Sequence, residues 1–335
     1  MKKIMVILAT MLLFTCCVQN ADEKNDPIPV TDRFSESRDK AIDFLYQNQL
    51  TDGEFPTDSC TDEAMQNCVY DSSPFVTSFV LYSLKDSDNQ KVAEMKDKGL
   101  AFLLSEQGTG GVWKYWTKKN SRYSDPDVDD TSTISFILKH NNVRYTDNTP
   151  VLSSNKNKDG IYMTWIRRAG ADNDVDCVVN ANVLFYLGKN DPSVCSYLNR
   201  ALLSDGPCAI YYPDKMILYY AVTRAYKNNV SCLGENKDRI IQSTLSSQKA
   251  DGSFGSDMDT ALALNTLMNL DYSGDELDYG LNNLLTTQRA DGSWPRAEFY
   301  LGAPFYYGSD SLTSALAIEA LEKHLMQKGA QDQNE

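Results

Sequence analysis

Histidine is scarce in this sequence, and the loops that build several common catalytic sites are missing. His140 and His324 are the only histidines among 335 residues, and they do not form the two-histidine motif of a helical metal site. We find no glycine-rich loop that would cradle a phosphate and no nucleophile elbow around a serine. The sequence therefore gives no sign of a P-loop nucleotidase, an α/β-hydrolase or a two-histidine metalloenzyme.

Positive charge is also in short supply. Lysine and arginine number 32 against 46 aspartates and glutamates, so the formal net charge is −14. An acidic chain without a basic patch repels nucleic acid and anionic lipid surfaces. We therefore expect no nucleic-acid partner, and contact with a membrane only through a lipid anchor.

The apolar run at the N-terminus is too short to cross a bilayer. Residues 4 to 14 follow two lysines and precede two cysteines and a polar stretch, the pattern of an export signal. A cysteine directly after such a run resembles a bacterial lipoprotein cleavage site, so we expect lipidation of Cys16 or Cys17. The signal would then cover residues 1 to 17, and a polar tether would cover residues 18 to 32. A plain secretory signal is the alternative; either way we expect an exported protein of the bacterial cell envelope, periplasmic or at the cell surface.

An even number of cysteines remains after the signal. Six cysteines in an oxidising compartment suggest disulfides, with fifteen pairings open. We favour a bond between Cys60 and Cys68 because it closes a short loop. The alternative is that several of them are small buried hydrophobic residues. The six are Cys60, Cys68, Cys177, Cys195, Cys208 and Cys232.

A turn of one kind recurs six times along the chain. Asp-Gly or Gly-Gly tolerates a positive φ, and in five copies an aromatic residue follows the last glycine by two positions. A recurrence of this kind at intervals of some tens of residues is typical of repeat architectures, in which no unit buries its apolar face alone. The copies lie at 51 to 55, 109 to 113, 158 to 162, 204 to 208, 250 to 254 and 290 to 294, and four follow Gln49, Gln107, Gln248 and Gln288.

The turns separate two kinds of helical pattern. An amphipathic segment precedes each turn, and a more uniformly apolar segment follows it, which predicts an outer and an inner helix. The sequence thus predicts an all-α double ring, an (α/α)6 toroid of six inner and six outer helices over residues 33 to 326, followed by a polar tail over residues 327 to 335. Residues 141 to 158 show no convincing stripe, so the third outer helix is the weak point. The inner segments are marked by Thr77, Thr131, Asn180, Met216, Thr260 and Ser314.

One inner segment begins with an acidic motif. The sequence DPDVDDTSTISFIL places Asp127, Asp129 and Asp130 before an apolar run. The motif resembles that of class II terpene cyclases such as squalene-hopene cyclase, whose pattern is Asp-x-Asp-Asp-Thr-Ala at the start of an inner helix. The glutamine-led turns are likewise similar to the glutamine-tryptophan repeats of that superfamily, which has the same toroidal fold.

The resemblance implies that Asp129 is a general acid that protonates an alkene or epoxide, with Asp127 and Asp130 holding it in place. A helix N-terminus favours the ionised carboxylate by less than about one pKa unit, whereas burial opposes ionisation by up to about 3 to 5 units. A dry cavity would therefore keep the acid protonated, and a wet one would not. The alternative is that these aspartates merely cap the helix. The histidine that assists the acid in the family has no evident counterpart.

Metal binding is a further interpretation of the acidic residues. Asp125, Asp127 and Asp129 alternate as in an EF-hand, but residues 130 and 136 are not the required glycine and glutamate, so only a looser calcium site stays open. The single ring also resembles the beta subunits of protein prenyltransferases, whose zinc ligands are an aspartate, a cysteine and a distant histidine. Asp174 or Asp176 with Cys177 offers two of these ligands, without a suitable histidine. We expect neither a metal nor a cofactor.

Polar residues at other inner helix starts are expected to gather at one mouth of the ring. Helix capping alone would also explain them, and paired carboxylates at such a mouth would suit glycoside hydrolysis on a similar double ring. The residues are Asp174, Asp176, Asn180 and Asn182, together with Asp257, Asp259 and Asp310.

Two hypotheses of function stay open. The first is a cyclase, an isomerase in reaction class, that protonates an isoprenoid or another apolar substrate. The second is a non-catalytic toroid that binds an apolar ligand or a partner in the envelope, which export and the single ring favour. A polysaccharide-active enzyme is a third, weaker hypothesis. The fold does not choose among them.

Overall fold

The structure is a computed structural model that describes residues 30 to 204 and 208 to 332. Within these residues the chain is mostly helical, with twelve α-helices and six short strands. The predicted export signal, Cys16 and Cys17, most of the tether and the centre of the turn at 204 to 208 lie outside the described residues. No helix of the described segments has the length and apolar character needed to span a membrane.

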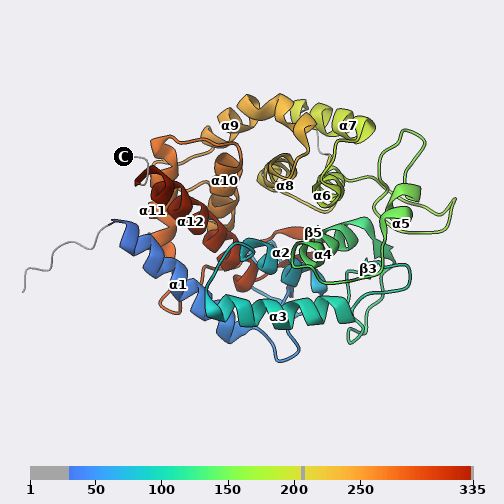
Figure 1. Ribbon diagram of the computed structural model, residues 1–335, viewed down its shortest axis with the longest axis horizontal. Coiled ribbons are helices and arrows are strands. Elements are labelled where there is room, and N and C mark those ends of the chain that lie inside the picture. Colours follow the sequence, from blue (N-terminus) through green and yellow to red (C-terminus); the bar gives the residue numbers. More distant parts are fainter. Residues whose placement is uncertain (1–29, 205–207, 333–335) are drawn as a thin grey trace, which may run out of the picture.

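Six helices form a closed inner ring (Figure 1). Each contacts the next one in the ring, and the last contacts the first. Their uniformly apolar sequences explain this position, since all ten residues of the first inner helix are buried. The inner helices are α2 (Pro74–Ser83), α4 (Val128–His140), α6 (Cys177–Leu187), α8 (Lys215–Lys227), α10 (Asp257–Asn269) and α12 (Asp310–Asp332).

The remaining helices surround this ring and alternate with the inner ones along the chain (Figure 1). The predicted all-α fold with alternating inner and outer helices is confirmed. Residues 141 to 158 contain only a six-residue helix, as the missing stripe predicted. The outer helices are α1 (Val30–Asn48), α3 (Gln90–Ser105), α5 (Thr149–Ser154), α7 (Pro192–Leu203), α9 (Lys237–Leu245), which follows the 3-10 helix η1 (Ser231–Asn236), and α11 (Asp275–Thr287).

Five of the six repeated turns are bonded to an inner helix in the same way, and the centre of the remaining turn, at 204 to 208, lies outside the described residues. The backbone N–H of Trp113 donates to Thr131 Oγ1 of α4 over 3.1 Å. Thr131 lies in the first turn of α4, which begins at Val128. Most of the other inner helices likewise begin about three residues before the polar residue that marked them in the sequence. Equivalent bonds run from Phe55 to Thr77, from Tyr162 to Asn180, from Phe254 to Thr260 and from Trp294 to Ser314.

The glutamine before a turn links that turn to the next outer helix. Gln49 Nε2 donates to the carbonyl of Gly53 and to that of Met95 in α3, and Gln248 and Gln288 make the same pair of bonds with their own neighbours. Among the described residues, Gln107 Nε2 has no partner. Gln107 Oε1 instead accepts the backbone N–H of Thr146, just before α5, over 3.2 Å.

A small sheet was not part of the predicted ring. Its four antiparallel strands have the order β2-β1-β6-β5 and join the first turn region to the last. A separate pair of strands precedes α4 and aligns its first residues. The strands are β1 (Asp58–Cys60), β2 (Cys68–Tyr70), β3 (Trp113–Lys114), β4 (Pro126–Asp127), β5 (Tyr300–Gly302) and β6 (Phe305–Gly308).

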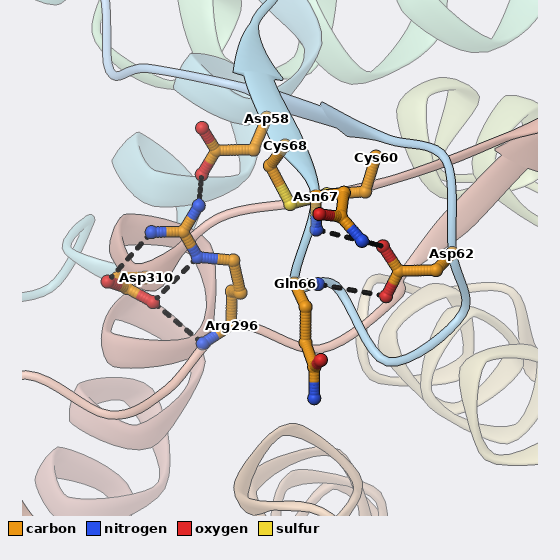
Figure 2. The surroundings of a disulfide bond; sticks show 8 residues. All are labelled: Asp58, Cys60, Asp62, Gln66, Asn67, Cys68, Arg296 and Asp310. Carbon is orange, nitrogen blue, oxygen red and sulfur yellow. Dashed lines mark hydrogen bonds and ion pairs between the residues drawn. A yellow bond between two sulfur atoms is a disulfide. The ribbon is translucent and has the colours of Figure 1, made fainter.

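The described cysteines form three disulfides. The predicted Cys60–Cys68 bond is confirmed and joins β1 to β2 (Figure 2). The other two bonds, Cys177–Cys208 and Cys195–Cys232, close loops that the sequence left open. Hydrogen bonds join the same segments, among them those from Cys177 N–H to the carbonyl of Cys208 and from Asn199 to the carbonyl of Cys232.

Candidate active site

A pocket of about 450 Å³ opens at the N-terminal ends of the inner helices α2, α4 and α6. This size lies within the usual range for small-molecule sites. The walls are largely aromatic and come from segments far apart in the sequence. Among the lining residues are Phe75, Tyr115, Trp116, Asp127, Asp129, Asp130, Trp165, Tyr211, Tyr212, Tyr300, Phe305 and Tyr307.

The acidic motif forms one wall of this pocket. Asp127 ends the short strand β4 and is the N-cap of α4, where its carboxylate accepts the backbone N–H of Asp130 over 2.7 Å. Asp127, Asp129 and Asp130 all line the pocket and are all buried. The structure thus brings together the three residues that the resemblance singled out.

Asp129 has one hydrogen-bond donor on each carboxylate oxygen. Asn182 Nδ2 of α6 donates to Asp129 Oδ1 over 2.7 Å, and the hydroxyl of Tyr212 donates to Oδ2. Burial raises the pKa of Asp129 to about 7; the Tyr212 bond and the Asn182 bond oppose the rise, and the charge of Asp127 adds to it. Burial thus outweighs both the helix dipole and the hydrogen bonds, which is the condition for an acid that keeps its proton near neutral pH.

The two flanking carboxyls are shifted in the same direction. Burial raises the pKa of Asp127 to about 6, against its hydrogen bonds with Asp130. Burial and then the charge of Asp127 hold the pKa of Asp130 well above its usual range. Near neutral pH the motif therefore retains protons instead of carrying three negative charges.

Two partners of Asp129 had no assigned role in the sequence. Asn182 lies among the polar residues at the start of α6, and Tyr212 lies just before α8, where the sequence marked no site residue. Neither contact has a local signal, because the two residues follow Asp129 by 53 and 83 positions. The family's assisting histidine has no equivalent here; an amide and a phenol contact the acid instead.

The polar residues predicted at the start of α6 bind neighbouring segments of the chain. Asp176 caps α6 and also accepts backbone N–H groups from Ile210 and Tyr211. Asn180 bonds the backbone of Tyr162. Asp174 accepts the hydroxyl of Tyr211 over 2.8 Å, so it supports a pocket wall. Asp174, Asp176 and Asn180 are not themselves among the residues that line the pocket.

The acids of the later repeats also lie away from the pocket lining. Asp259 forms a capping box with Ser256 at the start of α10, next to Asp257. Asp310 accepts hydrogen bonds from Arg296, which also pairs with Asp58 of β1 (Figure 2). These bonds connect the sheet to α12, so helix capping and ion pairing explain these residues.

Within residues 30 to 204 and 208 to 332, no group of three or more histidine, cysteine, aspartate or glutamate side chains is arranged to hold a metal ion.

Comparison with known proteins places the fold. No protein-family model and no curated protein matches the sequence. Among solved structures, the type II terpene cyclase MstE from Scytonema superposes with a TM-score of 0.71 at 16% identity, over 89% of this chain and 99% of that one. The chain has the type II terpene cyclase fold.

Two further structures show how widely this fold is used. The ent-copalyl diphosphate synthase of Streptomyces platensis has a TM-score of 0.57 at 20% identity, over 75% of this chain and 50% of that one. A GH76 alpha-mannanase of Bacteroides thetaiotaomicron also has a TM-score of 0.57, at 7% identity, over 89% of this chain and 97% of that one. At these identities the likeness is one of fold, and the chemistry has to be argued from the site.

Proposed function

We propose that this protein is a class II cyclase-type enzyme in which Asp129 protonates an isoprenoid or another apolar alkene. One observation carries the proposal: a carboxyl that is only 7% exposed lines an aromatic pocket and has a pKa of about 7. General acids work best when their pKa lies near the working pH. A helix cap needs neither this burial nor this pocket.

The protonation step needs only a residue of this chain. The Asp129 carboxyl gives its proton to one alkene carbon, where a new C–H bond forms from the π electrons, and the other carbon becomes a cation. Neighbouring double bonds attack this cation in turn and close rings. The last cation then loses a proton to solvent water, which restores a double bond, and Asp129 regains a proton from solvent, so that the product is an isomer of the substrate. The electron-rich faces of the surrounding rings stabilise cationic carbon along this path.

A single ring of helices, which favoured a non-catalytic toroid in the sequence analysis, is compatible with an enzyme. MstE is described as a type II terpene cyclase, and this chain covers 99% of it, so a protein of that description has the extent of one ring. MstE has also been solved with geranylgeranyl dihydroxybenzoate as its substrate. A polyprene joined to a polar aromatic head is therefore the first substrate class to try on this protein.

An exported location is part of the proposal. Three disulfides among the described residues support an oxidising compartment. Anchoring through Cys16 or Cys17 would keep the pocket close to a source of apolar molecules. Replacing both cysteines with serine should abolish labelling by a fatty acid and release the protein from membranes; labelling that persists in this variant would refute the anchor.

The direct test is turnover in heavy water. The full chain is incubated in D2O with geranylgeranyl dihydroxybenzoate and simpler polyprenes. Mass spectrometry should then find a cyclised product one mass unit heavier than the isomer made in H2O, because one deuteron enters and one proton leaves. Asp129→Asn should make no product. Asp259→Asn, which alters the first turn of α10 outside the pocket, serves as the matched control and should retain turnover.

The other hypotheses give different results in the same assay. Binding of a polyprene that the wild type never converts, across the whole panel, would favour a non-catalytic ligand-binding toroid. Release of sugars from mannan, without conversion of any polyprene, would favour the polysaccharide-active hypothesis suggested by the mannanase likeness. Deuterium incorporation that survives in Asp129→Asn would remove this residue from the role of acid.

A further inference from the structure

A buried arginine lies behind the acid. Arg224 of α8 is 2% exposed, and the described residues place no carboxylate within ion-pair distance of it. Its guanidinium group lies instead against four aromatic rings. The guanidinium carbon is 4.7 Å from the ring centre of Phe79, 4.8 Å from Tyr82, 4.4 Å from Phe185 and 5.2 Å from Tyr220.

A contribution to folding stability does not by itself explain why an arginine is buried at this position. A buried charge loses its hydration, and apolar side chains of similar volume often replace buried charges without loss of stability. The ring contacts offset part of that cost. Yet Arg224 Nε still has no partner among the described residues. This arrangement suggests that the guanidinium group serves the hydrogen bond that it does make.

That bond fixes the orientation of a neighbouring amide. Arg224 Nη2 donates to Asn182 Oδ1 over 2.7 Å. Because a guanidinium group can only donate, the oxygen of the amide must face Arg224 and its NH2 group must face Asp129. Asn182 Nδ2 indeed lies 2.7 Å from Asp129 Oδ1. Asn182 therefore cannot accept a proton from Asp129.

The second oxygen of Asp129 has a different partner. The hydroxyl of Tyr212 is its neighbour, and a hydroxyl can either donate or accept. We propose that Arg224 is a positioning residue that locks Asn182 as a donor to Asp129 Oδ1, so that Oδ2 is the atom that carries the transferable proton. This inference rests on the proposed function for its catalytic meaning, whereas the placement of the proton can be measured without turnover.

Arg224 is the cation that is linked to Asp129 through Asn182. Arg122 also lines the pocket, but it pairs with Asp71 and is present whether or not Arg224 is replaced. The remaining titratable groups that act on Asp129 or line the pocket with it are acidic or phenolic, and each would gain or keep a proton when the positive charge of Arg224 is lost. They are Asp127, which is the N-cap of α4, Asp130 in α4, Asp176 at the start of α6, and the phenols Tyr115, Tyr211, Tyr212, Tyr300 and Tyr307. Loss of the arginine therefore removes a positive charge and also frees the amide to turn its oxygen toward a protonated Asp129. Both changes favour the protonated form of Asp129.

The test is a titration of the acid in Arg224→Met. Methionine has a similar length and suits an aromatic environment. The full chain is labelled with aspartate carrying 13C in the carboxyl group, and the NMR signal of Asp129 is assigned by its absence in Asp129→Asn. We expect the midpoint of the Asp129 titration to rise by about one pH unit, with a thermal midpoint equal to or above that of the wild type. An unchanged titration midpoint would overturn the proposal.

Two further variants separate positioning from general destabilisation. Arg224→Lys keeps the charge and remains a donor only, so it should restore most of the wild-type titration. In Asn182→Leu the amide that Arg224 orients is already absent. Adding Arg224→Met to this variant should therefore shift the titration midpoint of Asp129 less than it does in the wild type. Equal shifts in both backgrounds would mean that Arg224 acts through its charge alone and would overturn the positioning role. If Arg224→Met does not fold, Arg224→Gln removes the charge with a smaller change in shape and is expected to shift the titration in the same direction.

The outcome is separable from that of the turnover assay. A raised titration midpoint in Arg224→Met, in a protein that converts no polyprene, would support the placement of the proton and count against the proposed function. Conversion of a polyprene by wild type and Arg224→Met with the same pH profile would support the function and refute the inference.

Discussion

Replacing Asp129 with asparagine tests whether burial governs this carboxyl. The introduced amide can offer its oxygen to Asn182 and its NH2 group to Tyr212, as a carboxyl protonated on Oδ2 would, so we expect the variant to fold. Burial raises the pKa of Asp129 from 3.8 to about 7 in the folded protein. Between these two values the folded state binds more protons than the unfolded state, so Asp129 makes the wild type less stable as the pH rises.

The size of this effect follows from the shift. Between pH 5 and pH 8 the ionisation of Asp129 should remove about 2.5 kcal/mol from the stability of the wild type. Asp129→Asn lacks this loss, and any constant cost of the substitution cancels when the two pH values are compared. For about 300 ordered residues the unfolding entropy corresponds to about 1.6 °C per kcal/mol, so the thermal midpoint of the wild type should fall by about 4 °C more than that of the variant.

Thermal unfolding followed by circular dichroism at pH 5, 6, 7 and 8 measures this difference. Asp251→Asn is the control, because hydrogen bonds with Ser253 lower the pKa of Asp251, which is therefore ionised throughout this range in both states. Its curve should run parallel to that of the wild type. If the curve of Asp129→Asn also runs parallel, Asp129 is hydrated and ionised, and the argument for a dry acid is wrong.

Three further predictions concern activity, turns and disulfides. Turnover should decline above pH of about 7, because Asp129, with a pKa of about 7, then loses its proton; a rate that rises steadily to pH 9 would contradict this. Gly111→Ala should cost at least about 2 kcal/mol in urea unfolding, since its Cβ would lie 2.2 Å from a backbone oxygen, whereas Gly170→Ala has a similar φ, meets no atom within 4 Å and should cost less. Replacing both Cys195 and Cys232 with serine opens a loop of 37 residues and should lower the free energy of unfolding by about 3.8 kcal/mol in the chain-entropy model; a loss below about 1 kcal/mol would indicate that native contacts already close this loop.

The double ring was predictable because its signals are local and repeated. Each glutamine, glycine and turn aromatic lies within a few residues of the others, and the polar residue that accepts the turn N–H follows after 6 to 22 positions. Helix type was likewise encoded in the spacing of apolar residues. The sheet was missed because β1 and β6 pair across most of the chain, and no short-range pattern announces such a pairing.

The candidate site was only half predictable. The motif from Asp127 to Asp130 stands out in the sequence, and its place at the start of an inner helix follows from the turn pattern. The partners Asn182 and Tyr212 do not stand out, and Arg224 gave no signal at all, since an arginine in a helical pattern usually faces solvent. Their roles depend on which faces of α6 and α8 turn toward α4.

The sequence by itself determined the order of the helices, their alternation between two rings and the position of three aspartates at one helix start, because each of these depends on residues close together in the chain. Whether those aspartates are ionised caps or protonated acids depends on the water around them. That water is excluded by Tyr212, Tyr300 and the other aromatic residues that the ring brings over the motif from distant repeats. Only the tertiary structure decided this point, because the free energy of desolvation depends on every atom near a carboxyl, whatever its distance along the chain.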